Sequence, residues 1–426
     1  MQSFALQGHY FADENEAADN EKVFSDCEFV VIDGSSLAIE KSTAAVQTLK
    51  FVAPDAKLVV VLGAKATPAN TEFIKKSGAN SVIFEDEFYE KSKIEYFCAQ
   101  AIKPSYLPVK TTDLAAGVVL ECPLYHLMPL AKKFVLAVPA GTAISEAKFQ
   151  KLLELGEVYI HKSGADAFGK YAMSLDVKSA AALPRRCRGL FLNLNVTFSE
   201  LVLHISDQST NSSFADGKKL YDRIELLASD LLTTLSAVGE AWHIINNAGF
   251  GGFGQIDRGP AIAAYSGLLS FISGVGDPKT VMIASLLADI GLLDVLPKAT
   301  AKIRLGQMAE MNAEERASYE NHPVYSVNQC LSKKVALPDL IKSTILYSHE
   351  RIDQKGFPNR PLPEKILDEA FILQICEMID LNTQVRIGES RKDINEIRKQ
   401  IFDQEFASAN RMTIEFLSRI KTSLLA

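Results

Sequence analysis

The stretch YSHERIDQKGFPNRP (residues 347–361) places a histidine, acidic side chains and a Gly-aromatic-Pro turn close together in the chain. Apolar residues recur every three to four positions on both sides of it, at 337–348 and 364–387. This spacing predicts amphipathic helices that flank a sharp turn. The stretch therefore poses one question, which is whether His349 belongs to a metal site or only stabilises a turn between helices.

Helical periodicity extends over the whole C-terminal part of the chain from residue 255 onward. The predicted helices are separated by Pro and Gly and lie at 260–273, 280–293, 313–331, 337–348, 364–387 and 391–424. Their Asp, His and Glu residues are far apart in sequence. A metal site inside such an all-helical domain takes one or two ligands from each helix.

Four segments of this region resemble the motifs of the HD-GYP family, in the same order and at matching intervals. They are LLADIGLLDV (286–295), AEERASYENHPVYSVNQCL (313–331), YSHERIDQKGFP (347–358) and ILQICEMIDLNTQVRIGE (372–389). The resemblance covers about 215–424. It implies an HD-type helical fold, a carboxylate-bridged metal centre and hydrolysis of cyclic di-GMP.

Compared with that family, the chain keeps some groups and has lost others. The acids and histidines that stay in ligand positions are Asp289, His322, His349 and Glu377. The lost groups are three histidines, now Arg258, Ala288 and Ser348, and a lysine beside the scissile phosphate, now Leu292. The turn motif survives as His349, Glu350, Asp353, Gly356, Phe357 and Pro358, and the last motif as Asp380 and Arg386.

These changes leave several expectations for metal binding. In the first, His322 and His349 are structural and no cofactor is bound. In the second, Asp289, His322 and His349 hold a single Fe, Mn or Zn ion, since two imidazoles and a carboxylate suit such ions. A full dinuclear site is the least expected. Arg258 is expected either to bridge Asp289 and Glu377 or to point into solvent.

The N-terminal residues 1–106 alternate short apolar strands with helical runs, which predicts a small parallel-sheet domain. The strands are EFVVID (28–33), AKLVVVLG (56–63) and NSVIF (80–84). This block resembles a response-regulator receiver domain with Asp33 at the phospho-acceptor position. Because Glu85 replaces the family's lysine, the alternative is a structural pseudo-receiver.

Residues 107–175 predict a small α+β domain, and residues 176–254 a linker followed by a long helix. That helix carries an apolar stripe of Leu220, Ile224, Leu227, Leu231, Leu235 and Val238. The stripe is wide enough to pack against a partner helix. We expect either a homodimer through it or packing of the stripe within its own chain.

Composition narrows the remaining classes of function. The 426 residues carry a net charge of −7, which argues against a nucleic-acid partner. The six cysteines form no CxxC pair, and no apolar run is long enough to span a membrane, so a cytoplasmic protein is expected.

The sequence thus predicts a catalytically degenerate HD-GYP-like protein, acting as scaffold or sensor in the cyclic di-GMP network. Its partners would be signalling proteins such as diguanylate cyclases. The lost cations disfavour binding of cyclic di-GMP itself. The alternative is a metal-dependent phosphohydrolase that works with a reduced, single-metal site.

Overall fold

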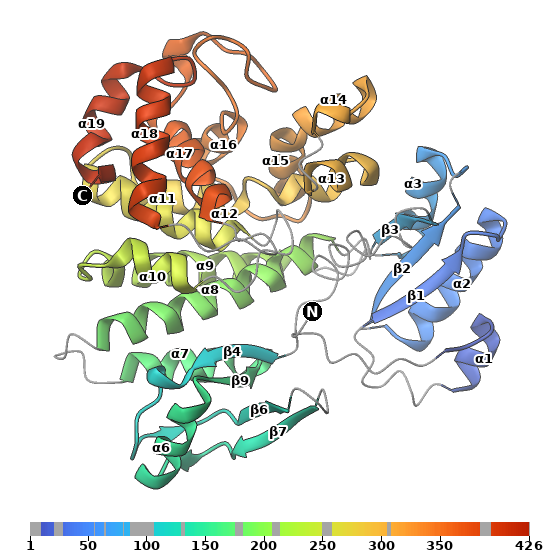
Figure 1. Ribbon diagram of the computed structural model, residues 1–426. Coiled ribbons are helices and arrows are strands. Elements are labelled where there is room, and N and C mark those ends of the chain that lie inside the picture. The colour runs from blue at the N-terminus through green and yellow to red at the C-terminus, as the bar shows by residue number, and fades with distance from the viewer. Residues whose placement is uncertain are drawn as a thin grey trace.

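The computed structural model describes most of the chain and shows three hydrophobic cores. In Figure 1 the first lies in the blue N-terminal elements, the second mainly in the cyan and blue-green elements, and the third in the green to red helices. The described residues are 10–20, 29–54, 56–63, 65–79, 81–85, 106–128, 133–174, 182–206, 214–248, 258–304, 308–383 and 393–425.

The N-terminal core is a parallel sheet with strand order β1-β2-β3. The elements are α1 (Glu14–Asp19), β1 (Phe29–Gly34), α2 (Ile39–Val52), β2 (Lys57–Leu62), α3 (Pro68–Lys76) and β3 (Ser81–Phe84). From Leu58 to Leu62 the central strand β2 is apolar and buried, as expected for a parallel sheet. The predicted α/β alternation is confirmed. The receiver-like identity of this domain stays a prediction.

The middle core is formed mainly by an antiparallel sheet of order β4-β9-β6-β7, with a short β5-β8 pair. Its elements are β4 (Tyr106–Lys110), β5 (Val119–Leu120), β6 (Leu124–Met128), β7 (Lys133–Val138), β8 (Thr142–Ala143), α6 (Glu146–Leu155), β9 (Glu157–His161) and α7 (Ala165–Ser174). The sheet is tied to the following helix by Arg188, whose guanidinium pairs with the buried Asp113 carboxylate.

The region expected to be a linker and one long helix needs correction. Residues 182–206 form α8 (Ala182–Ser206), and the next segment is split into α9 (Phe214–Leu235) and α10 (Ala241–Ala248). The basic run Arg185–Arg186 and the adjacent Pro184 obscured the apolar spacing of α8. All three helices contribute to the same core as the C-terminal helices, and Figure 1 shows them as one layer against that domain.

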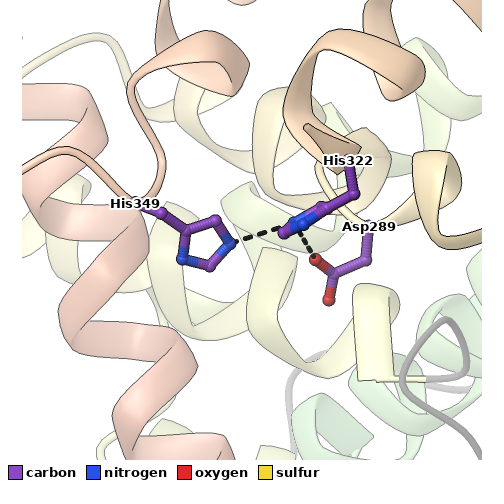
Figure 2. A group of neighbouring side chains, drawn as sticks. All are labelled: Asp289, His322 and His349. Atoms are coloured by element: carbon purple, nitrogen blue, oxygen red, sulfur yellow. Dashed lines mark hydrogen bonds and ion pairs between the residues drawn. The ribbon is translucent and has the colours of Figure 1, made fainter. Parts of the chain in front are cut away.

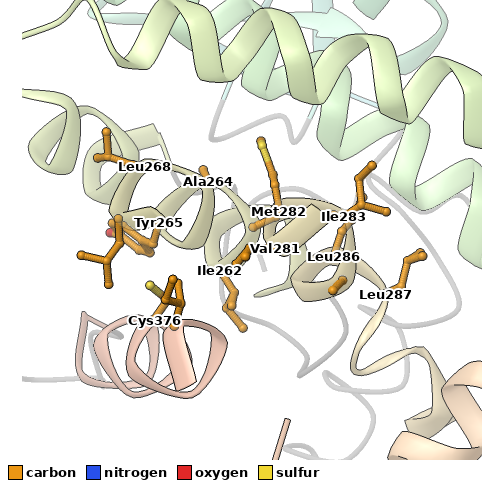
Figure 3. Close-up of a cluster of buried hydrophobic side chains, with 14 of the residues drawn as sticks. Ile262, Ala264, Tyr265, Leu268, Val281, Met282, Ile283, Leu286, Leu287 and Cys376 are labelled. Atoms are coloured by element: carbon orange, nitrogen blue, oxygen red, sulfur yellow. The ribbon is translucent and has the colours of Figure 1, made fainter. Parts of the chain in front are cut away.

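The C-terminal domain is all helical, as predicted. It contains α11 (Gly259–Ser273), α12 (Pro278–Leu287), α13 (Pro297–Arg304), α14 (Ala313–Glu320), α15 (His322–Ser332), α16 (Asp339–Leu346), α17 (Asp368–Thr383), α18 (Ile394–Ser408) and α19 (Ile414–Leu425), with a 3-10 helix η5 (Ile290–Asp294). Buried residues of α11 and α12, with Cys376 of α17, form the centre of the core (Figure 3). None of the described helices is both long and apolar enough to cross a membrane.

The apolar stripe of α9 is buried within its own chain, so it does not serve as the expected dimer surface. Ile224, Leu227, Leu231 and Leu235 belong to the core that α8 and the C-terminal helices share. Of the two arrangements left open by the sequence, packing within the chain is the one observed. A homodimer through another surface stays a prediction.

Two leucines on α9 test this packing. Leu231 is 1% exposed and Leu226 is 63% exposed. Leu231→Ala is expected to lower the free energy of unfolding by about 2–5 kcal/mol, because it leaves a cavity in the core. Leu226→Ala is expected to change it by less than about 0.5 kcal/mol. Urea unfolding followed by fluorescence of Trp242, the single tryptophan, measures both, and equal effects would contradict the burial of the stripe.

Candidate metal centre

Asp289 is placed at the end of α12, directly before η5. The next turn is fixed by a close approach to α15, since a Cβ at Gly291 would lie 2.0 Å from the His322 carbonyl oxygen. The Ser326 hydroxyl accepts a hydrogen bond from the Gly291 amide at 2.8 Å and donates one to the Ala288 carbonyl. These contacts bring the Asp289 carboxylate to the N-terminus of α15.

His322 is the first residue of α15 and is almost fully buried. Its Nδ1 lies 2.7 Å from the Tyr319 carbonyl oxygen, so that nitrogen carries the proton and donates it. The Tyr319 ring also stacks on the imidazole, with the ring centroids 5.0 Å apart. The lone pair of Nε2 is therefore directed away from Tyr319, as in a metal-binding histidine held by a backbone carbonyl.

His349 follows α16 at the start of the turn quoted above. The turn folds back closely, since a Cβ at Gly356 would lie 2.5 Å from the His349 carbonyl oxygen. The Phe357 amide donates to that same oxygen at 3.2 Å. The Phe357 ring stacks on the imidazole at a centroid distance of 4.8 Å, and the Phe357–Pro358 peptide is cis. The turn thus sets the orientation of the His349 ring.

The three side chains converge on one point, as Figure 2 shows. The Nε2 atoms of His322 and His349 are 3.1 Å apart, and His322 Nε2 lies 3.6 Å from Asp289 Oδ1. All three ligand atoms lie within 4.8 Å of one another. Two imidazole nitrogens bound at about 2.0–2.1 Å to one ion are separated by roughly 2.9–3.4 Å. The observed nitrogen separation falls inside that range.

Two acids of the quoted stretch stabilise the turn. The Glu350 carboxylate is fully buried and accepts hydrogen bonds from the amides of Asn359 and Arg360 at 2.5 and 2.9 Å. Gln374 of α17 donates to the Glu350 carbonyl at 2.8 Å. Asp353 pairs with Arg351 through both guanidinium branches. The acids of the motif therefore position His349.

Glu377 lies on the other side of His349 from the convergence point. Its Oε2 is 3.7 Å from His349 Nδ1, whereas His349 Nε2 faces His322. This separation is longer than a hydrogen bond, so Glu377 lies beside the His349 ring without orienting it through one. Burial and the Asp289 charge raise the pKa of the Glu377 carboxyl to about 8. Glu377 lies outside the group of converging ligand atoms, and its predicted role as a metal ligand stays a prediction.

Arg258 is buried and contacts the last motif. Its Nε lies 2.5 Å from Asp380 Oδ2, and Nη2 donates to the Glu377 carbonyl oxygen at 3.0 Å. The guanidinium is buried, so it does not point into solvent. It pairs with Asp380, and a bridge between the Asp289 and Glu377 carboxylates stays a prediction.

The other substituted positions offer no ligand atoms to an ion. Ala288 and Leu292 are buried apolar residues, and the Ser348 hydroxyl is buried without a hydrogen-bond partner. Arg386 lies outside the described residues. Asp33 is far from this centre in the N-terminal domain, at an exposed end of β1, where Ser35 donates to its carboxylate at 2.7 Å.

The donor set fits one ion and does not fit two. Asp289, His322 and His349 supply two nitrogens and an oxygen with open positions left over, as in sites for Fe, Mn or Zn. Burial raises the pKa of the Asp289 carboxyl, but the neighbouring His322, His349 and Arg258 side chains outweigh that effect and hold the pKa below its usual value, so the carboxylate is ionised. Around Glu377 and Asp380 the described residues supply no imidazole other than His349, and Arg258 occupies Asp380.

The raised pKa of Glu377 predicts a pH dependence for the metal-free protein. The carboxyl titrates near 4.5 when unfolded and near 8 when folded. Between these values the folded state holds a proton that the unfolded chain has released, so stability falls as pH rises. Burial also lowers the pKa of His349 from 6.5 to about 3, which removes stability as pH falls below 6.5.

The two effects oppose each other below pH 6.5, so the Glu377 effect is isolated between pH 6.5 and 8. We expect the chelator-treated protein to lose stability over this interval, and Glu377→Gln to abolish most of that loss. Urea unfolding at the two pH values measures it. A loss of the same size in both proteins would show that another group is responsible.

Several residues of this centre were not found from the sequence. Tyr319 contacts His322 through both its carbonyl and its ring. It lies in the 313–331 segment, but the sequence did not single it out. Ser326 joins α15 to the Asp289 turn, and its only signal was its position one helical turn after His322. The contacts of Tyr319 and Ser326 depend on how these segments pack, which residue type alone does not reveal.

Comparison with known proteins identifies the domain that carries this centre. Residues 261–401 match the family model described as HD domain. The solved structure of Bd1817, an HDG"Y"P protein from Bdellovibrio bacteriovorus, is similar with a TM-score of 0.48 and 14% sequence identity, over 75% of this chain and 100% of that chain. No curated protein matches the chain. The match of residues 261–401 to the HD domain model confirms the predicted HD-type domain in the C-terminal part of the chain.

Proposed function

We propose that this protein is a catalytically degenerate HD-type signalling protein of the cyclic di-GMP network. Its HD domain would hold a single divalent ion at Asp289, His322 and His349 and act as a sensor or scaffold. One observation carries this proposal. The three ligand side chains converge on one point, whereas Arg258, which stands where the related family has a histidine ligand, is paired with Asp380.

The substitutions remove positively charged groups that a phosphodiester hydrolase needs. Two-metal enzymes use both ions to stabilise the attacking and leaving oxygens. Here the lysine position of the family is Leu292, which is 4% exposed and packed in the core. Arg258 is held by Asp380 and the Glu377 carbonyl, so it is not available to a phosphate. Neither of these two positions therefore offers a cation to a dianionic substrate.

A sensor role is supported by where the three ligand positions lie. Asp289 lies between α12 and η5, His322 begins α15 and His349 lies in the turn after α16. A bound divalent ion would supply a cross-link among these segments. The residues of this chain set the geometry for it through the Tyr319 carbonyl, the Phe357 ring and the Gly291 contact.

A series of side-chain contacts connects the N-terminal domain to the metal centre and supports the scaffold role. The Lys298 ammonium of α13 lies over the Phe84 ring of β3, 5.6 Å from its centroid. The same helix contacts α14, which ends just before His322, through the Lys302–Glu315 ion pair at 2.7 Å. We propose that signalling partners, such as diguanylate cyclases, or a second copy of the chain recognise the conformation of these connected domains.

The activity prediction follows directly. With Mn, Fe or Zn supplied, the protein is expected to produce no linear pGpG from cyclic di-GMP above the level of a His349→Ala control. Separation of the reaction products by chromatography measures this. Metal-dependent pGpG that disappears in the His349→Ala protein would contradict the proposal.

That contrary result would favour the second candidate, a phosphohydrolase that works with one ion. The triad itself keeps this candidate open, because two imidazoles and a carboxylate leave coordination positions for water and substrate. In that case both His322→Ala and His349→Ala should abolish product formation.

A further inference from the structure

Strand β7 (Lys133–Val138) lies at one edge of the antiparallel sheet in the middle domain, and Figure 1 shows it as the outermost strand there. Among the described residues β7 pairs only with β6, so the N–H and C=O groups along its other edge have no strand to bond. Such a row of open backbone groups is a template for the addition of a further strand.

The two edges of this sheet differ in how they are protected. The opposite edge strand, β4, carries Pro108 at its centre, and proline has no N–H to offer to an added strand. The sequence of β7, KFVLAV, contains no proline, and its one charged residue, Lys133, stands at the end of the strand. The irregularity in its pairing with β6 lies beyond Leu136, so residues 133–136 form a regular strand. This part of β7 therefore lacks the devices that usually prevent edge pairing.

Both faces of β7 present apolar side chains to solvent. Leu136 is 52% exposed and Val135 is 41% exposed. Leu136 is opposite Tyr125 of β6, and Phe134 is opposite Leu127, so these four side chains lie on one face of the sheet. Val135 points to the other face, because side chains alternate along a strand. A strand added at this edge would cover apolar side chains on both faces.

A second copy of β7 fits this edge across a two-fold axis perpendicular to the sheet. Opposed side chains of antiparallel strands share a face, so a residue can oppose only itself or a residue an even number of positions away. With Val135 at the axis, Phe134 opposes Leu136 of the partner subunit, which gives an aromatic–aliphatic pair on each side of the axis. Lys133 then opposes Ala137 of the partner subunit. The two lysines are roughly 14 Å apart along the strands, which is beyond the screening length of about 8 Å at physiological ionic strength.

We infer that β7 is a homodimer interface, in which two middle domains pair antiparallel about Val135 and join their four-stranded sheets into one continuous sheet. The six residues of β7 are fewer than the roughly 20–30 residues a side of a stable interface. The dimer is therefore reversible and depends on protein concentration. This interface is separate from the metal centre, so its failure would leave the proposed function unchanged.

Sedimentation velocity of the full-length protein, from micromolar to submillimolar concentration, tests the interface. The wild type is expected to shift from monomer towards dimer as the concentration rises. Val135→Lys brings two positive charges together at the axis and is expected to weaken dimerisation by about tenfold or more. Val119→Lys is the matched control, because Val119 on β5 is similarly exposed, at 45%, and lies outside this edge. It should dimerise like the wild type.

A cysteine at the axis tests the register without disturbing the strand. Opposed residues of an antiparallel pair have Cα atoms about 4.5–5.5 Å apart, within the range of a disulfide. Under mild oxidation Val135→Cys is therefore expected to form a covalent dimer on a non-reducing gel. Leu136→Cys should cross-link far less, since each cysteine would lie two positions from the other. The wild type, with its native cysteines, gives the background.

Three results would overturn the interface. They are a wild type that stays monomeric over the whole concentration range, a dimer that persists unchanged in Val135→Lys, and cross-linking of Val135→Cys no stronger than that of Leu136→Cys. The first would leave the edge to a strand of another protein, and the second would place the dimer contact elsewhere on the chain.

Discussion

Replacing Arg258 with alanine is expected to lower the free energy of unfolding of the helical domain by about 3–5 kcal/mol. The guanidinium and the Asp380 carboxylate are both buried and lie 2.5 Å apart. Removal of one partner leaves the other charge in the interior without compensation, which costs far more than the pair contributes when it is intact. Urea unfolding of the metal-free protein, followed by Trp242 fluorescence, measures the change.

Two comparisons identify the cause of this loss. Asp380→Asn in the Arg258→Ala background removes the stranded charge and should restore a large part of the stability. Arg419→Ala breaks an ion pair with Asp368 that is largely exposed, and is expected to cost less than about 1 kcal/mol. If Arg258→Ala costs no more than Arg419→Ala, the buried pair is not a structural element of the domain.

Replacing His322 with alanine is expected to weaken binding of Mn²⁺ by more than about 100-fold. Loss of a group that only supports a ligand costs about 10–100-fold in affinity, and loss of the ligand itself should cost more. His322 occupies the middle of the triad, close to both His349 and Asp289. Its removal therefore leaves two side chains that no third donor joins. Isothermal calorimetry with MnCl2 measures the affinity.

His126 on β6 provides the control for this experiment. It belongs to the middle domain and lies outside the metal-binding group, so His126→Ala should bind Mn²⁺ like the wild type. An affinity in His322→Ala within a few-fold of the control would mean that ions bind elsewhere on the protein.

The helical domain and its triad were predictable because the signals were local. Apolar spacing gave the helices, and the segments at 286–295, 313–331 and 347–358 identified Asp289, His322 and His349. Residue type and motif order suffice to predict such side chains, because helix ends and a Gly-Phe-Pro turn have a regular geometry that fixes where the side chains lie.

Features that depend on tertiary contacts were predicted less well. The stripe on α9 was apolar enough for a dimer, but sequence could not show that α8 and the C-terminal helices bury it. Arg258 was expected either beside Asp289 and Glu377 or in solvent; it is buried, and its ion pair with Asp380, one turn after Glu377 on α17, was not foreseen. Such choices between neighbouring partners depend on side-chain positions across 122 residues of sequence separation.

The most direct test of the account is the divalent metal content of the protein, purified without chelators and without a metal-binding tag. Elemental analysis should find one Fe, Mn or Zn ion per chain in the wild type and none in the His322→Ala and His349→Ala proteins. Two ions per chain would indicate the dinuclear centre of an active phosphohydrolase. A wild type without metal would contradict the single-ion site formed by Asp289, His322 and His349.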